Sequence, residues 1–262
     1  MELVIDGLSK DFMTRQGQPL TVLENINLTL HPEEFVALVG PSGCGKSTLL
    51  NLVAGLLSPS AGQIYFSDLT PPSQPVTGIV FQETGLFPWR SVYDNIAFGL
   101  EAQSVSKPEQ TARIAHYIEL VGLTGFEKAF PHQLSGGMRQ RVGIARALVI
   151  NPDLLLMDEP FSALDAQTRT IMQEELVALW EKTRLSTLYV THNIQEAVLL
   201  ADRVVLLSRR PGTINKILPI TIPRLERQQP QHAAAIADYV HLLWEQISQD
   251  AHSALLEVTT NE

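Results

Sequence analysis

The residues from Gly40 to Thr48 have the types and the spacing of a phosphate-binding loop. Their sequence, GPSGCGKST, fits the pattern G-x-x-x-x-G-K-[ST] and lies between an apolar run, Phe35–Val39, and a stretch with helical periodicity. Glycines let the backbone bend until successive N–H groups point at phosphate oxygens, and the N-terminus of the following helix adds partial positive charge. We expect the phosphates of a nucleotide to be bound by Gly40, Pro41, Ser42, Gly43, Cys44, Gly45, Lys46, Ser47 and Thr48.

Three side chains of this loop have the chemistry to act on a polyphosphate. Lys46 supplies a point charge to the β- and γ-phosphates, Ser47 offers a hydroxyl to Mg²⁺, and Thr48 is a neighbouring donor. Cys44 is the single cysteine of the chain. We interpret it as a small space-filling side chain, with redox control as the alternative.

A second candidate site is the acid pair Asp158 and Glu159, which ends the apolar run Leu154–Met157 and precedes Pro160. In phosphoryl-transfer chemistry, the first acid holds the coordination sphere of Mg²⁺ and the second polarises a water aligned with the γ-phosphate. On its own, the pair could equally cap a helix. Together with the loop upstream, it predicts hydrolysis of a nucleoside triphosphate.

The elements that must position these residues follow an α/β pattern. Short runs rich in Val, Ile and Leu alternate with stretches of helical periodicity, which predicts a mainly parallel sheet with an antiparallel flank. Strands are expected near Leu3–Ile5, Thr21–Leu30, Phe35–Val39, Gln63–Phe66, Gly78–Phe81, Leu154–Met157, Ser186–Val190 and Arg203–Ser208. Helices are expected at Lys46–Ala54, Pro108–Val121, Gly137–Val149, Ala166–Lys182 and Ile194–Leu200.

The domain organisation is predicted to be one ATPase-sized domain over residues 1–230 with a helical tail over 231–262. Little strand signal occurs between about 83 and 150, so this block is predicted to be an α-helical subdomain inserted in the α/β core. The first two strands should form an antiparallel pair, and the Pro-rich Thr70–Pro75 should be a surface loop. Apolar residues recur at helical spacing in the tail, which favours packing on the core over a regulatory role; they are Ile236, Val240, Leu243 and Ile247.

Composition limits what the chain can be. Its 262 residues are 45% apolar and 18% charged, enough for one large core with a satellite subdomain. The net charge of −9 gives no overall field that would attract nucleic acid or anionic lipid. A single cysteine fits a reducing compartment, and neither a secretory signal nor a bilayer-spanning run is expected.

A third motif carries a resemblance to a known family. The run Leu134-Ser-Gly-Gly-Met138, followed by Arg139-Gln-Arg, offers a hydroxyl and open N–H groups at a helix start. With the loop and the acid pair, it closely resembles the ATP-binding-cassette ATPases, whose signature is usually LSGGQ; here Met138 replaces the glutamine. The resemblance covers residues 3–210 and implies a P-loop NTPase (RecA-like) core.

The resemblance also implies roles for individual residues. In a head-to-tail dimer with a second cassette, ATP would lie between the loop of one subunit and Ser135, Gly136 and Gly137 of the other. Gln82 matches the glutamine that senses Mg²⁺ and the attacking water, and His192 matches the switch histidine at the γ-phosphate. Asp165 falls in the loop that crosses the dimer, and Phe12 falls where an aromatic ring stacks on adenine. Taken singly, Gln82 could be a surface amide, His192 a helix cap and Phe12 a core residue.

Further features resemble importers of nitrate, sulfonate, taurine and related small solutes. These are the LSGGM variant, Pro88-Trp89 and Ser208-Arg-Arg-Pro-Gly-Thr-Ile214. Members act on the cytoplasmic face of the cell membrane with two separate permease subunits and an extracytoplasmic solute-binding protein. Phe87 and Trp89 would receive a helix of the permease, or alternatively would pack the boundary between lobes.

Other classes of function remain as alternatives. An exporter half could be built from the same cassette, whereas ABC ATPases of DNA maintenance carry long coiled coils and translation factors carry two cassettes; neither feature occurs here. The arginines 139, 141 and 146 could suggest nucleic acid, but on one helix they are more often a solvated or salt-bridged face. We therefore predict no nucleic-acid partner.

Overall fold

The computed structural model describes residues 1–67, 76–103 and 105–260, and for residues 249–260 only the helical backbone. The chain divides into two compact units. Unit 1 joins Met1–Leu69 to Leu188–Glu262, and unit 2 is Thr70–Thr187. Within the described residues, no helix combines the length and the apolar character needed to cross a membrane.

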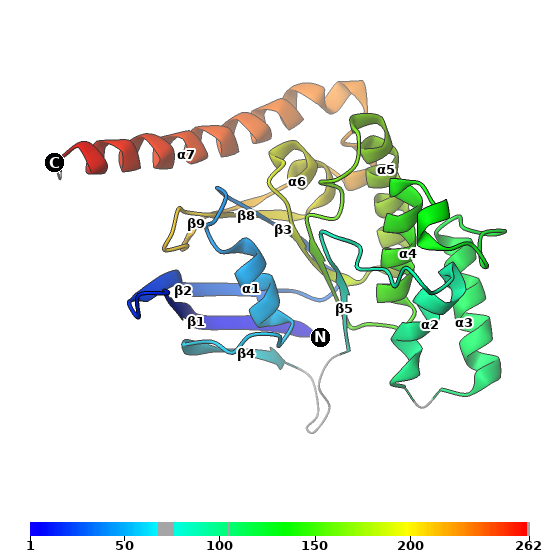
Figure 1. Cartoon of the computed structure of the whole chain (residues 1–262). Coiled ribbons are helices and arrows are strands. Elements are labelled where there is room, and N and C mark those ends of the chain that lie inside the picture. Colours follow the sequence, from blue (N-terminus) through cyan, green and yellow to red (C-terminus); the bar gives the residue numbers. More distant parts are fainter. Residues whose placement is uncertain (68–75, 104, 261–262) are drawn as a thin grey trace. The chain divides into compact units, whose positions relative to one another are not determined.

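Unit 1 contains an antiparallel sheet in the order β2-β1-β4 (Figure 1). Its strands are β1 (Glu2–Met13), β2 (Pro19–Leu30) and β4 (Ala61–Ser67). Apolar side chains of β1 and β2 alternate with polar ones and are buried on one face, as in a sheet with one side on the core. Helix α1 (Lys46–Val53) packs against β2.

Unit 1 also contains strands that belong to the nucleotide-binding core. β3 (Phe35–Val39) lies parallel to β8 (Arg203–Leu207), and β9 (Ile214–Pro219) pairs with β8 in the antiparallel sense. Every residue of β3 is buried. A strand covered on both faces must be apolar throughout, which explains why β3 shows no alternation in the sequence.

The C-terminal segment is fixed to helix α6 (Ile194–Leu200) by two buried arginines. The guanidinium of Arg227 donates to the carbonyl oxygens of Val198, Leu199 and Ala201, and Arg224 donates to that of Leu200. They satisfy the free carbonyls that any helix leaves at its C-terminus. Two single turns, η2 (Arg224–Glu226) and η3 (Pro230–His232), then lead into α7 (Ala233–Thr260), the long orange-to-red helix of Figure 1.

Unit 2 carries two parallel strands, β5 (Thr77–Val80) and β6 (Leu154–Asp158). Their register pairs Val80 with Met157, so the residues that follow both strands emerge at the same edge. Helix α5 (Ala166–Thr183) follows β6, and β7 (Ser186–Val190) continues from unit 2 into unit 1.

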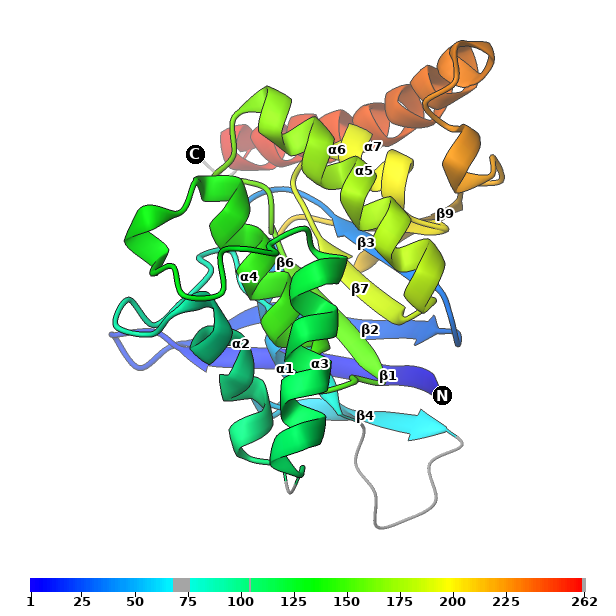
Figure 2. The same ribbon diagram turned by 90° about the vertical axis from the view of Figure 1, so that its right-hand side faces the viewer.

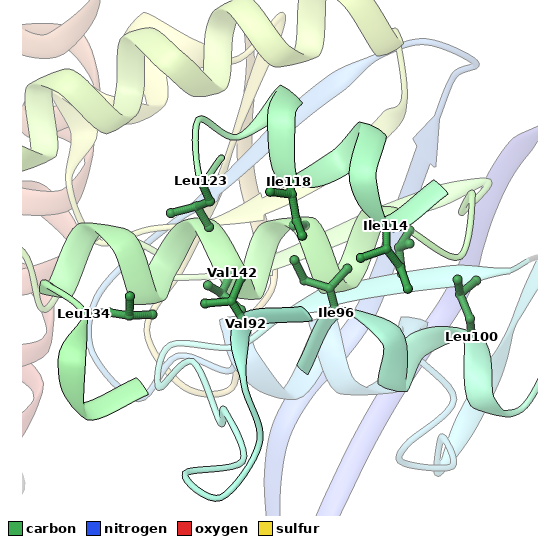
Figure 3. Close-up of a cluster of buried hydrophobic side chains, with 10 residues drawn as sticks. Val92, Ile96, Leu100, Ile114, Ile118, Leu123, Leu134 and Val142 are labelled. Atoms are coloured by element: carbon green, nitrogen blue, oxygen red, sulfur yellow. The ribbon is translucent and has the colours of Figure 1, made fainter. Parts of the chain in front are cut away.

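The other helices of unit 2 are α2, α3, η1 and α4, and Figure 2 shows α2, α3 and α4 side by side. They span Val92–Glu101, Lys107–Leu120, Pro131–Gln133 and Gly136–Leu148. Apolar side chains from α2, α3 and α4 meet in one buried cluster, which includes Ile96, Ile118 and Val142 (Figure 3). Burial of each such side chain stabilises folding by about 1.5–3 kcal/mol, so this cluster gives the helices a core of their own.

The structure confirms the predicted α/β class, the antiparallel β1–β2 pair and the helix in the tail, in which Ile236 and Leu243 are buried. Helices α1, α3, α4, α5 and α6 occur within one or two residues of the expected bounds. The prediction for β1 was too short, and α2 and β9 were not predicted. The expected loop Thr70–Pro75 lies outside the described residues. Unit 2 is larger than the predicted helical block, because it also includes β5, β6 and α5.

Candidate functional site

The phosphate-binding loop connects β3 to α1, as the sequence predicted. Gly40, Gly43 and Gly45 all have φ in the left-handed range, with values of 156°, 76° and 108°. Gly45 is the N-cap of α1, so its left-handed backbone turns the chain directly into the helix whose N-terminus faces the loop. A side chain at Gly45 would also collide with Leu23, since an added Cβ would lie 2.6 Å from its Cδ2 atom.

Lys46 is largely buried, with 7% of its surface exposed, and it bridges the loop from within. Its ammonium donates to the carbonyl oxygens of Gly40 and Pro41, at 2.8 and 3.0 Å. The cation is therefore already inside the cradle, where phosphate oxygens can replace these neutral acceptors. Burial raises the pKa of the Cys44 thiol, against an opposing effect of Lys46. This thiol stays protonated at neutral pH, which suits a space-filling role.

His192 lies in unit 1 on a rigid turn after β7. The N–H of Thr191 donates to the carbonyl of Leu38 at 3.2 Å, so this turn begins beside the strand that leads into the phosphate-binding loop. The hydroxyl of Thr191 bonds the buried carboxylate of Glu196 and accepts from the N–H of Asn193. His192 itself is exposed. These hydrogen bonds therefore fix the backbone on both sides of His192.

Phe12 is near the end of β1, opposite Leu20 of β2. The residue is 37% exposed, so Phe12 is not a buried core residue of unit 1. The ammonium of Lys10 lies 5.0 Å from the centre of its ring. An exposed aromatic ring of this kind can stack on a base.

In unit 2, the acid pair lies at the carboxyl end of β6, as predicted. Glu159 has a φ of 44°, which a residue with a side chain adopts only under constraint. Its carbonyl accepts from both the N–H and the hydroxyl of Ser162, at 3.1 and 2.9 Å. The turn that follows thus holds this strained backbone in place, and the side chains of Asp158 and Glu159 remain partly exposed.

Gln82 follows β5 at the edge of the sheet where Asp158 ends β6, so these two predicted Mg²⁺ ligands lie at the same edge of unit 2. Gln82 is exposed. Asp165 has a structural task as well, because it caps α5 by accepting from the N–H and the hydroxyl of Thr168 at 3.0 and 2.7 Å. These hydrogen bonds lower the pKa of the Asp165 carboxyl, which keeps it ionised.

The signature segment begins α4, with Ser135 as its N-cap. The hydroxyl of Ser135 accepts from the N–H of Met138 at 3.2 Å, and the Ser135 side chain is exposed. An added Cβ at Gly137 would lie 3.1 Å from Thr168 on α5, so this glycine allows α4 to approach α5 closely. Ser135 and Gly136 therefore form the accessible part of a helix N-terminus, the arrangement that binds anions, and Gly137 packs beneath them.

Trp89 stands on a loop that an unpredicted residue, Asn95, holds in shape. The buried amide of Asn95 accepts from the N–H of Phe87 and donates to the carbonyls of Phe87, Arg90 and Ser91. Arg90 lies over the ring of Phe87 and pairs with Glu101. Trp89 is left 72% exposed. Phe87 packs on Phe98, and its ring also lies 5.6 Å from that of Trp89, so Trp89 is the more exposed residue of the predicted aromatic pair.

The arginines of α4 have partners within unit 2. Arg139 donates to the carbonyl of Leu134, and Arg141 pairs with Glu175 on α5. Arg146 donates to the carbonyls of Thr84 and Gly85, and burial lowers its pKa. Arg146 thus supports the segment after Gln82, a role that the sequence analysis did not assign.

Comparison with known proteins decides the family. The family model described as ABC transporter matches residues 23–162, more than half of the chain, and its span includes the phosphate-binding loop, Gln82, the signature segment and the acid pair. The chain belongs to the ABC transporter family. As a member of this family it binds ATP and acts as an ATPase, in agreement with the function predicted from the sequence.

Individual ABC proteins are similar over most of the chain. The nitrate import ATP-binding protein NrtD of Synechocystis sp. is 47% identical, with 85% of this chain and 84% of that protein covered. The taurine import ATP-binding protein TauB of Rhizobium johnstonii is 49% identical over 81% of each. Among solved structures, the ATP-binding cassette MJ0796, a dimer bound to ADP and Pi, is 29% identical with a TM-score of 0.71, covering 83% of this chain and 98% of that one.

Proposed function

We propose that this ABC protein powers the import of a small oxyanion, such as nitrate, a sulfonate or taurine, through separate membrane permease subunits. The observation that carries this proposal is the likeness to the ATP-binding subunits of nitrate and taurine importers over more than four fifths of the chain. The phosphate-binding loop and the acid pair supply the ATPase chemistry. The solute would be chosen by the partners, because the cassette itself only converts hydrolysis into opening and closing.

Glu159 is the proposed general base of hydrolysis. Its fixed backbone limits the positions that its carboxylate can reach, which favours accurate alignment of a water molecule. His192 and Gln82 are proposed to contact the γ-phosphate and the attacking water, and Lys46 to neutralise the phosphate charge. Phe12 is proposed to stack on the adenine ring.

The proposed metal ligands fit Mg²⁺ by their chemistry. Ser47, Gln82 and Asp158 offer a hydroxyl, an amide and a carboxylate, all oxygen donors of the kind this ion prefers. Among the described residues, no group of three or more His, Cys, Asp or Glu could hold a metal by itself. Substrate phosphates would supply further oxygen ligands, and the ion would neutralise charge on them during hydrolysis.

ATP hydrolysis is proposed to need two copies in head-to-tail contact. The signature segment is an exposed second anion site on unit 2, and the cassette MJ0796 is a dimer in its post-hydrolysis state. Ser135, Gly136, Gly137 and Asp165 of one copy would then close on the nucleotide in the phosphate-binding loop of the other.

Trp89 is proposed to receive a helix of the permease on the cytoplasmic face of the membrane. Large exposed aromatic side chains are typical anchors of protein interfaces, and Asn95 gives this one a fixed position. The permease pair and an extracytoplasmic solute-binding protein would complete the importer.

Purification of the tagged chain from its own cells tests this function. We expect hydrophobic membrane subunits to copurify, and we expect the reconstituted complex to take up nitrate, taurine or an alkanesulfonate in an ATP-dependent way. Trp89→Ala should retain hydrolysis by the isolated protein and lose the membrane subunits, whereas Phe126→Ala, another exposed aromatic residue of unit 2, should keep them. A complex with nucleic acid, or outward transport, would refute the proposal.

A further inference from the structure

The loop between β8 and β9, one of the importer-like features of the sequence, packs directly against the phosphate-binding loop within unit 1. Ser208 and Thr213 close this hairpin loop through reciprocal backbone and hydroxyl hydrogen bonds. Gly212, near its end, forms an isolated bridge with β2: its N–H donates to the carbonyl of Val22 at 2.9 Å, and its carbonyl accepts from the N–H of Glu24 at 3.0 Å.

Gly212 touches the phosphate-binding loop so closely that no side chain would fit. An added Cβ would lie 2.1 Å from the carbonyl oxygen of Cys44 and 3.2 Å from Cδ2 of Leu23. The φ of Gly212 lies outside the left-handed range, so the obstacle to a larger residue is contact alone and not backbone conformation. Ordinary contacts of a Cβ atom lie at 3.4–4 Å, so a methyl group 2.1 Å from the Cys44 oxygen would displace Cys44 or the hairpin by more than 1 Å.

Leu23 of β2 supports the same loop from a second direction. This fully buried side chain lies against Gly45, where an added Cβ would be 2.6 Å from its Cδ2 atom. Leu207, the last residue of β8, lies against Gly40 at the other end of the loop, where an added Cβ would be 2.8 Å from its carbonyl oxygen. The loop is thus enclosed by β2, by the end of β8 and by the hairpin that follows.

We propose that Gly212 is a positioning residue for the nucleotide, which lets the β8–β9 hairpin and β2 together hold the phosphate-binding loop in the conformation that accepts phosphate. The backbone N–H groups of this loop bind phosphate only when several point at it at once. Displacement of Cys44 by a side chain at position 212 therefore weakens binding without removing any group that touches the nucleotide.

The single cysteine makes the proposal measurable. Cys44 is 1% exposed and is the only thiol of the chain, so its rate of reaction with a thiol reagent reports movement of the loop. In the full-length protein, we expect Gly212→Ala to raise this rate and the dissociation constant of ATP, each by about tenfold or more. Arg209→Ala, an exposed change in the same hairpin, should alter neither quantity.

A second variant tests the same loop from the opposite side. Leu23→Ala removes the support under Gly45 and should also expose Cys44 and weaken ATP binding. Leu100→Ala removes a buried leucine from the helical core of unit 2 and controls for lost stability, because under strongly native conditions it should leave the thiol rate unchanged. Thiol rates and ATP affinities at the wild-type level in folded Gly212→Ala would overturn the proposal. If Gly212→Ala does not fold, a wild-type thiol rate and ATP affinity in Leu23→Ala would overturn the proposal instead.

Discussion

The phosphate-binding loop and the signature segment use the same device and differ in how they are supported. Both present backbone N–H groups at the start of a helix, α1 in one and α4 in the other. The loop is enclosed by buried strands and contains its own cation, Lys46. The signature segment exposes Ser135, and the cation beside it, Arg139, donates to the carbonyl of Leu134.

This difference indicates an order of events. A site with a buried lysine and a fixed backbone can bind ATP on a single chain, because its anion-binding groups are already in place. An exposed helix N-terminus binds an isolated anion weakly, and gains affinity when a second protein surface excludes water around it. The comparison therefore predicts that the loop binds first and that the signature of a second copy recognises the bound nucleotide.

The largest expected effect comes from removing the proposed general base while the phosphate-binding loop and the signature segment stay intact. Glu159→Gln should lower steady-state hydrolysis by about 10²–10⁴-fold, the usual contribution of a general base, and should leave an ATP-bound dimer that persists in gel filtration. Glu174→Gln, an exposed change on α5, should have wild-type turnover. Retained turnover in Glu159→Gln would show that another group activates the water.

Loss of the Lys46 charge should weaken ATP binding even by a single, monomeric chain. Lys46→Ala removes a charged donor to phosphate, worth about 1.5–3 kcal/mol, so the dissociation constant of ATP should rise by about 10–100-fold. Isothermal titration at a concentration that keeps the chain monomeric measures it, with the exposed Lys128→Ala as control. Equal affinities in the two variants would contradict the role of Lys46.

Changing the signature should spare the single chain and act on the dimer. Ser135→Asp keeps a good N-cap for α4 and adds a negative charge where phosphate would approach. We expect ATP affinity of the monomer to stay within about threefold and hydrolysis to fall by about tenfold or more.

A mixture sharpens this comparison. In a head-to-tail dimer, combining Lys46→Ala with Ser135→Asp subunits restores an intact site in each mixed pair, about a quarter of all sites in an equal mixture. Hydrolysis should reappear on mixing. Mixed dimers without any recovery would count against a site shared between two copies.

The smallest effect concerns the helical core that supports the signature. Ser91 caps α2 by accepting from the N–H of Asp94, so Ser91→Ala should lower the free energy of unfolding by about 1 kcal/mol in urea titrations. Ser106→Ala is a matched control, because Ser106 is the N-cap of α3 without a side-chain hydrogen bond. ATP affinity should stay unchanged in both variants. A lower ATP affinity in Ser91→Ala would mean that the phosphate-binding loop depends on the helical core that supports the signature segment.

Much of the fold and of the site could be predicted because its signals are local. β3 is a continuous apolar run, and the spacing of Gly40, Gly45 and Lys46 leaves few other interpretations. Helix α2 was missed although Ser91 and Asp94 form a start signal, because its apolar pattern is short and contains Gly99. β9 was missed because a short strand that ends in Pro219 owes its conformation to pairing with β8.

Several features of the site depend on contacts between distant residues and have no local signal. The amide of Asn95 could be recognised as important only once it was seen to be buried beneath the loop that carries Trp89. Gly212 belongs to a motif that was identified in the sequence. A glycine is needed there because the backbone contacts Cys44, which is far away in the chain. Backbone conformation at Glu159 likewise could not be inferred from an acid pair after a strand.

Because the backbone at Glu159 is left-handed, the residue that would make the protein most stable at this position differs from the residue that hydrolysis needs. Glycine adopts this conformation without the penalty of about 1–2 kcal/mol that a residue with a Cβ incurs, and asparagine tolerates it better than glutamate does. A library of variants selected only for thermal stability should therefore enrich glycine or asparagine at position 159. The most stable variants recovered would be ones that no longer hydrolyse ATP.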